Sequence, residues 1–111
     1  VEPRDIFIAP VAAIRGVLER ASLTLDDIDL FEINEAFAAQ MLACLKQLQL
    51  DREKVNICGG AIALGHPIGA SGARTLVTLL SALKRRNLRR GLVSLCLGGG
   101  NAVAMIVERD V

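Results

Sequence analysis

The sequence predicts an α/β fold in which a mixed β-sheet carries helices on both faces. Apolar residues recur at helical spacing in segments that alternate with short apolar runs. Two of these runs, near the C-terminus, are almost continuously apolar, as in strands covered on both faces. The length of 111 residues, 52% of them hydrophobic, predicts a single domain over residues 1–111.

The first half of the chain predicts two helices around one strand. Residues 1–9 read as irregular, and Pro10 begins a helix in the N1 position, with apolar residues at helical spacing up to residue 21. Residues 29–33 alternate as a short strand. The helix predicted at about 35–48 is apolar almost all round, which is typical of a helix buried on most sides.

The second half predicts one helix and three strands. A strand begins at residues 55–57 and runs into the glycine-rich stretch 59–72. A helix over about 71–86 ends in basic residues, as the helix dipole favours, and strands follow at 92–97 and 102–107. A strand ahead of the first helix would complete a βαβ unit. We therefore expect the first strand to be missing and the domain to be truncated at its N-terminal edge, and the chain begins with Val1 rather than Met.

Composition narrows the classes of partner. The net charge is only +1 and aromatic residues make up 3%, so the sequence predicts neither the basic surface nor the stacking side chains that bind nucleic acid. No apolar run reaches about 18 residues, so no membrane partner is expected. The high apolar content predicts a homo-oligomer or a piece of something larger. Three cysteines without a CxxC pair indicate a reducing compartment: the cytoplasm, or the mitochondrial matrix or a peroxisome in a eukaryote.

Asn34 stands where the first strand meets the next helix, and strand ends are where α/β sheets bind ligands. It could equally be the helix N-cap. His66, the only histidine, lies in the glycine-rich stretch 59–72 and is either structural or functional. That stretch has neither a P-loop lysine nor a GxGxxG pattern, which weakens a nucleotide-binding interpretation.

Cys96 precedes three consecutive glycines between the last two strands. Free backbone N–H groups there could form an oxyanion hole, or the segment is a glycine-rich hairpin with an inert cysteine. Cys44 and Cys58 are predicted to be core residues, and the cysteines and His66 show no zinc spacing, so no metal is expected. The basic cluster at 84–90 is interpreted as a solvated helix end.

Three motifs in order resemble the C-terminal half of a thiolase: Asn34-Glu35-Ala36-Phe37, then Gly65-His66-Pro67-Ile68-Gly69-Ala70-Ser71-Gly72, then Cys96-Leu97-Gly98-Gly99-Gly100. The resemblance covers essentially the whole chain. The residues at positions 70–74 are more similar to those of the biosynthetic acetyl-CoA acetyltransferases than to those of the degradative long-chain thiolases. It implies the fold of one thiolase half and a place in lipid metabolism. The implied reaction is the reversible Claisen condensation of acyl-CoA thioesters, with coenzyme A thioesters as substrate and no cofactor.

The same resemblance implies a role for each motif residue. Cys96 matches the base that takes the α-proton, and His66 matches the histidine that activates the nucleophile and contacts the thioester oxygen. Asn34 matches the residue that holds a water in one oxyanion hole, and Gly98 supplies an N–H to the other. Ala36 and Phe37 match residues that line the pantetheine tunnel.

Two departures from the family pattern stand out. Ala102 occupies a position that is usually glycine, and no cysteine sits in the motif of the acyl-accepting nucleophile. We therefore expect the N-terminal thiolase half as a partner, and an inactive chain without it. The competing hypothesis is a non-catalytic, thiolase-like domain that works by associating with another chain.

Overall fold

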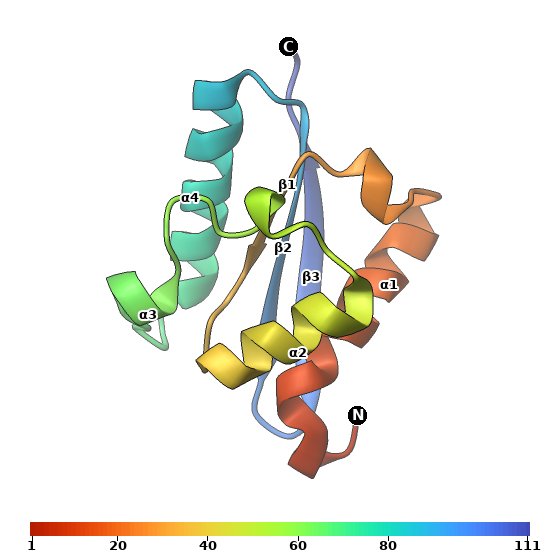
Figure 1. Ribbon diagram of the computed structural model, residues 1–111, viewed down its shortest axis with the longest axis vertical. Coiled ribbons are helices and arrows are strands. Elements are labelled where there is room, and N and C mark those ends of the chain that lie inside the picture. The colour runs from red at the N-terminus through yellow and green to blue at the C-terminus, as the bar shows by residue number, and fades with distance from the viewer.

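The computed structural model describes residues 1–111 as a three-stranded sheet flanked by helices (Figure 1). Three short 3₁₀ segments lie at Pro3–Ile8, Leu25–Asp27 and Arg52–Lys54. The strands are β1 (Leu30–Ile33), β2 (Arg90–Leu97) and β3 (Asn101–Glu108), and the helices are α1 (Ala9–Ala21), α2 (Ala38–Leu48), α3 (Ala61–Leu64) and α4 (Ser71–Arg86). None of these helices combines the length and apolar character needed to cross a membrane.

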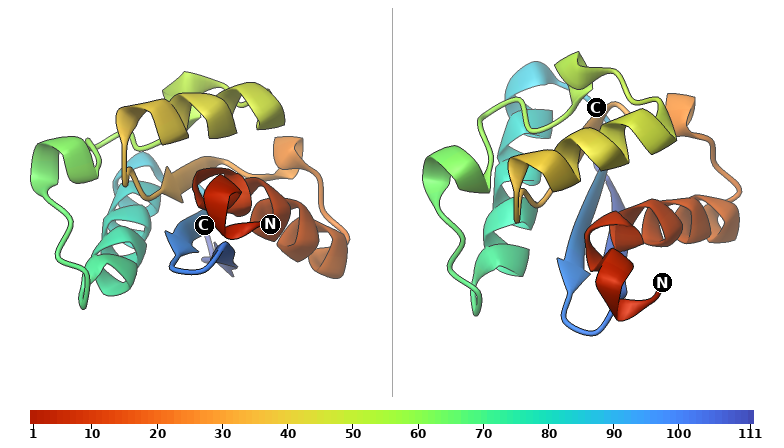
Figure 2. Two further views of the ribbon diagram at one scale, coloured as in Figure 1. Left: turned by 90° about the horizontal axis from the view of Figure 1, so that it is seen from below. Right: turned by 60° about the horizontal axis from the view of Figure 1, so that its bottom comes forward.

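The sheet is mixed, as predicted. Strand β2 lies at its centre, parallel to β1 and antiparallel to β3. Helix α4 covers one face, while α1 and α2 lie on the other (Figure 2). The two faces bury separate cores: Phe31 and Leu92 belong to the core beneath α1 and α2, and Leu30 and Val93 to the core beneath α4. The alternation of side chains along each strand produces this division.

Three expectations for the first half of the chain are wrong. Residues 3–8 form a 3₁₀ helix rather than an irregular segment. The second helix begins at Ala38 instead of near residue 35, because Phe37 is extended, with φ −147° and ψ 152°. That helix is also not buried on most sides, since 4 of its 11 residues are buried and Leu42 is 56% exposed. The extended segment before α2 leaves residues 34–37 free to form a turn at the end of β1.

Residues 55–57 do not form the expected strand. Val55 makes a single parallel bridge to Phe31, and then Asn56 adopts a left-handed conformation with φ 48°, which ends the pairing. Beyond this bridge, the Asn56 side chain rather than the backbone hydrogen-bonds to β1. Its Oδ1 accepts from the Ile33 N–H at 2.9 Å, and its Nδ2 donates to the Ile33 carbonyl at 2.8 Å. An amide side chain thus supplies both hydrogen bonds that a neighbouring strand residue would supply.

The last two strands form the predicted hairpin, but only β2 is covered on both faces. Residues 91–95 of β2 are buried, whereas β3 alternates between exposed and half-buried residues. Val103 and Met105 are about half exposed, at 49% and 50%. The apolar run of β3 therefore reflects an edge strand with one uncovered apolar face, not a central strand.

Candidate active site

Asn34 extends the pairing of β1 by one residue and turns its side chain towards the glycine-rich segment. Its N–H donates to the Ser94 carbonyl at 2.9 Å, and the residue is 1% exposed. Its Nδ2 donates to His66 Nε2 at 3.4 Å, while Oδ1 is buried without a partner. The N-cap alternative is wrong, because α2 begins four residues later with Phe37 in the cap position. Asn34 is therefore a buried amide with one unused acceptor beside the only histidine.

His66 lies between α3 and α4, in an exposed segment. Gly65, with φ 97°, ends α3 and reverses the chain just before it, in a conformation that L side chains rarely adopt. Pro67 then leads into α4, and the Ser71 hydroxyl contacts His66 Nδ1. Both ring nitrogens are thus engaged, Nε2 by Asn34 and Nδ1 by Ser71.

Cys96 lies near the end of β2, two residues after Ser94, whose carbonyl accepts from the Asn34 N–H. Strand alternation places Cys96 on the face of the sheet that carries Leu92 and the core beneath α1 and α2. No hydrogen bond joins Cys96 to Asn34 or His66. Burial raises the pKa of the Cys96 thiol. A thiol in this state rests protonated near neutral pH and forms a strongly basic thiolate when it loses the proton.

The segment that follows Cys96 is a glycine turn. Gly99 and Gly100 have φ values of 86° and 91°. Gly98 is exposed, and a Cβ added to it would meet no atom within 4 Å. Ala102, where the resemblance led us to expect glycine, pairs with Cys96 in the regular hairpin register. The departure therefore leaves the turn intact, because Gly99 and Gly100 supply both left-handed residues.

Ala36 and Phe37 occupy the bend between Asn34 and α2. The Ala36 N–H donates to Gln40 Oε1 at 3.2 Å. Phe37 is 59% exposed and packs edge to face on Phe7, with ring centroids 5.1 Å apart. This places a half-exposed aromatic pair next to the Asn34 turn.

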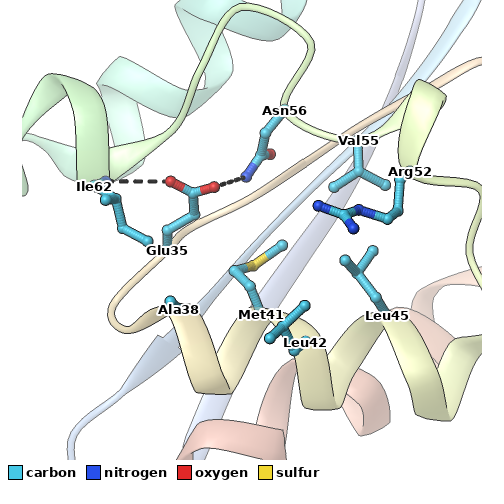
Figure 3. Close-up of a pocket in the computed structure, with 9 residues that line it drawn as sticks. All are labelled: Glu35, Ala38, Met41, Leu42, Leu45, Arg52, Val55, Asn56 and Ile62. Carbon is cyan, nitrogen blue, oxygen red and sulfur yellow. Dashed lines mark hydrogen bonds between the residues drawn. The ribbon is translucent and has the colours of Figure 1, made fainter.

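Glu35 is a motif residue for which the sequence predicts no role, and its carboxylate joins three segments of this region (Figure 3). Oε2 accepts from Asn56 Nδ2 at 3.3 Å, and Oε1 accepts from the Ile62 N–H in the first turn of α3 at 3.2 Å. A Cβ on Gly60 would overlap this carboxylate. The missing Cβ of Gly60 thus lets the backbone at residue 60 lie against the Glu35 carboxylate. In the sequence, Gly60 is only one of several glycines in its segment and does not by itself indicate this contact.

Glu35 also borders a cavity of about 440 Å³ between α2 and the segment 52–62 (Figure 3). The cavity is lined mainly by apolar side chains of α2 and contains none of Asn34, His66 and Cys96. The largest cavity of the chain is therefore separate from the residues that the motifs single out.

A second acidic residue that sequence analysis overlooked, Glu32, lies two positions before Asn34 on β1 and is 1% exposed. Burial raises its pKa to about 7, the nearby Arg74 guanidinium lowers it and the Glu35 carboxylate raises it. Arg74 Nη1 lies 4.0 Å from Glu32 Oε2, and both this oxygen and Arg74 Nε lack hydrogen-bond partners. Glu32 is thus buried beside a half-buried Arg74, and the hydrogen bonding of the pair is incomplete.

The other cysteines divide between core and surface. Cys44 is fully buried, as predicted, and its S–H donates to the Phe7 carbonyl at 3.4 Å. Burial raises the pKa of Cys44, a hydrogen bond from Gln40 lowers it, and the negative charge of a Cys96 thiolate raises it. Cys58 was predicted to be a core residue, which is wrong: it is exposed, and Arg85 donates to its sulfur at 2.8 Å.

The basic cluster at 84–90 is partly neutralised. Arg90 and Arg89 both pair with Glu108, at 2.6 and 3.5 Å, and so belong to the sheet edge rather than to a free cationic patch. No group of three or more His, Cys, Asp or Glu side chains is placed to hold a metal ion.

Comparison with known proteins places this arrangement in a family. The family described as "Thiolase, C-terminal domain" matches residues 1–109. The chain belongs to the thiolase family. Acetyl-CoA acetyltransferases from Cupriavidus necator and Escherichia coli are 58% and 59% identical to it over 109 residues. The crystal structure of the Bacillus anthracis acetyl-CoA acetyltransferase superposes with a TM-score of 0.96, at 56% identity over 97% of this chain.

These thiolases are much longer than this chain. The matched region covers 98% of the chain but 28% of each of the two relatives, and 27% of the Bacillus anthracis protein. The comparison confirms the predicted resemblance and the α/β fold of a thiolase C-terminal domain. The roles of Asn34, His66, Cys96, Gly98, Ala36 and Phe37 stay predictions.

Proposed function

We propose that this chain is the C-terminal catalytic half of an acetyl-CoA C-acetyltransferase that condenses acyl-CoA thioesters reversibly. The observation that carries the proposal is the contact between Asn34 Nδ2 and His66 Nε2. It joins two motifs 32 residues apart in a chain 58–59% identical to acetyl-CoA acetyltransferases. A domain with a purely structural role has no need of a buried amide with a free acceptor beside an exposed imidazole.

The chemistry assigns different tasks to these groups. Condensation requires removal of a proton from the carbon next to a thioester, and the thioester oxygen then carries the negative charge of the enolate. Cys96 is the proposed base, since burial raises the pKa of its thiol and its thiolate is correspondingly basic. His66, Asn34 acting through a water, and the Gly98 N–H are the proposed groups facing the negatively charged oxygens.

His66 has a second proposed task, the activation of the acyl-accepting thiol. That thiol is expected on the N-terminal thiolase half, because neither Cys44, which is buried in the core, nor the exposed Cys58 lies beside His66. Ala36 and Phe37 are the proposed lining of the pantetheine tunnel, and the exposed Phe37 ring offers it an apolar wall.

The same proposal includes the setting of the enzyme. The uncovered apolar face of β3, with Val103 and Met105, supports association with the N-terminal half or with another copy in a homo-oligomer. We place the enzyme in lipid metabolism and in a reducing compartment. The cytoplasm is the first choice, and the mitochondrial matrix or a peroxisome applies in a eukaryote.

The test is acetoacetyl-CoA cleavage by the purified chain, with and without a separately expressed N-terminal thiolase half. We expect no turnover by the chain alone, because the base and the acyl acceptor must face one another in one pocket. Activity that develops on mixing supports the proposal. Robust turnover by the chain alone refutes the need for a second half, and inactivity of a stable mixed complex favours a non-catalytic interaction domain.

Variants then test the assignment of the base. In the complete enzyme, Cys96→Ser is expected to lose exchange of the α-proton of acetyl-CoA, while acylation of the nucleophile continues. Cys58→Ser is the matched control, because Cys58 is exposed and its sulfur contacts Arg85, at the end of α4 opposite to Ser71. Normal condensation by Cys96→Ser would show that another group is the base.

A further inference from the structure

Ser71 is the first residue of α4 and is 2% exposed. Its Oγ makes two contacts, one with His66 Nδ1 and one with the Pro67 carbonyl at 3.1 Å. The first turn of α4 fixes the residue in place, because the Ser71 carbonyl accepts from Thr75 Oγ1 at 2.9 Å. The hydroxyl therefore faces the imidazole from a rigid position.

The hydrogen-bond partners determine where the imidazole proton lies. Asn34 Nδ2 carries only donors, so His66 Nε2 must accept from it through a lone pair. The ring proton of neutral His66 is then on Nδ1 and is donated to Ser71 Oγ. The hydroxyl proton of Ser71 in turn goes to the Pro67 carbonyl. In this arrangement each of the three contacts joins one donor to one acceptor. With the ring proton on Nε2, two donors would face each other at Asn34.

We propose that Ser71 is a positioning residue that holds His66 in the Nδ1–H tautomer and so keeps Nε2 as the proton acceptor beside Asn34. The tautomer follows from the contacts alone. Its consequence rests on the proposed function: Nε2 can take the proton of an incoming thiol, and the resulting Nε2–H can then donate to a thioester oxygen. Ser71 acts only through His66.

A spectroscopic measurement tests the tautomer without any assay of activity. The full translated product that contains this chain is labelled with ¹⁵N-histidine, and the His66 signals are identified by their loss in His66→Asn. For neutral His66 we expect a protonated Nδ1 and a pyridine-type Nε2. The opposite tautomer in the wild-type protein overturns the proposal, whether or not any variant folds.

Ser71→Ala removes the hydroxyl that accepts the Nδ1 proton, and we expect a shift of His66 towards the Nε2–H tautomer. Ser81→Ala is the matched control, since Ser81 lies on the same helix and is exposed. An unchanged wild-type tautomer in a folded Ser71→Ala variant also overturns the proposal.

In the complete enzyme, Ser71→Ala is expected to lower kcat by about 10- to 100-fold, at or below the contribution of a general base, with KM little changed. A loss confined to KM contradicts a role through His66. Failure of the proposed function gives a different pattern. In that case wild-type His66 is still the Nδ1–H tautomer and Ser71→Ala still shifts it, but neither the wild type nor the variants condense acyl-CoA.

Discussion

Replacement of Glu32 by glutamine should change how the stability of this domain depends on pH. The Glu32 carboxyl is 1% exposed, and its pKa is raised from 4.5 to about 7, chiefly by burial. In the unfolded chain the carboxyl regains its ordinary pKa. Between these two pH values the folded protein binds a proton that the unfolded chain has lost. The free energy of unfolding therefore falls as pH rises from about 4.5 to 7.

The pKa values set the size of the effect. The gap between 4.5 and about 7 corresponds to about 3.4 kcal/mol for complete titration, of which about 2.5 kcal/mol falls between pH 5 and pH 8. At high pH the ionised carboxylate has only Arg74 as a counter-charge, with 4.0 Å between the nearest charged atoms. Glutamine does not ionise, so Glu32→Gln should lack this part of the pH dependence.

Urea unfolding followed by circular dichroism at pH 5 and pH 8, at one protein concentration, measures both free energies. From pH 5 to pH 8 the wild type should lose about 2.5 kcal/mol more stability than Glu32→Gln. Glu19→Gln is the control, because it removes the same charge from an exposed position on α1. If wild type and Glu32→Gln differ by less than about 0.5 kcal/mol in this change, the buried carboxyl is not destabilising when ionised, and the reasoning is refuted.

Three further predictions test the packing. Gly60→Ala should displace the Glu35 carboxylate and cost about 1–3 kcal/mol of unfolding free energy. Gly69→Ala is the control and should cost much less, because its new Cβ meets no atom within 4 Å. Equal losses for the two variants in urea unfolding contradict the Glu35 contact. Gly91→Ala should also cost about 1–3 kcal/mol, because the new Cβ comes within 2.8 Å of Leu79, and an unchanged thermal midpoint would show that this side chain moves freely. The isolated chain should self-associate at micromolar concentration through the apolar face of β3, and a monomer by light scattering that binds no apolar dye excludes this.

Local sequence patterns were sufficient for several elements. Apolar spacing and a basic C-terminal turn predicted α4 at residues 71–86, the bounds that the structure has. The last two strands were also predicted, each one or two residues too short at its ends. These elements are regular and long enough for their side-chain period to be evident in the sequence.

Other features depend on contacts between residues far apart in the chain. Asn56 ends a strand after a single bridge because its amide pairs with Ile33, 23 residues away. The apolar run of β3 could not show that the strand lies at an edge, since exposure depends on which elements pack against it. Glu35 at Gly60 is a similar case, because the need for a glycine there comes from a side chain 25 positions earlier.

Residue types and their local spacing are properties of the chain alone. They were enough to predict the α/β class, the order of most elements, and three motifs whose combination is typical of a thiolase C-terminal domain. Three features became evident only in the folded chain: Asn34 contacts His66, Ser71 lies against the other ring nitrogen, and Glu32 is buried with an unsatisfied oxygen. Hydrogen bonding, desolvation and tautomer all depend on distances in space. Those distances are set when β1, β2 and α4 pack together, and no local pattern encodes them.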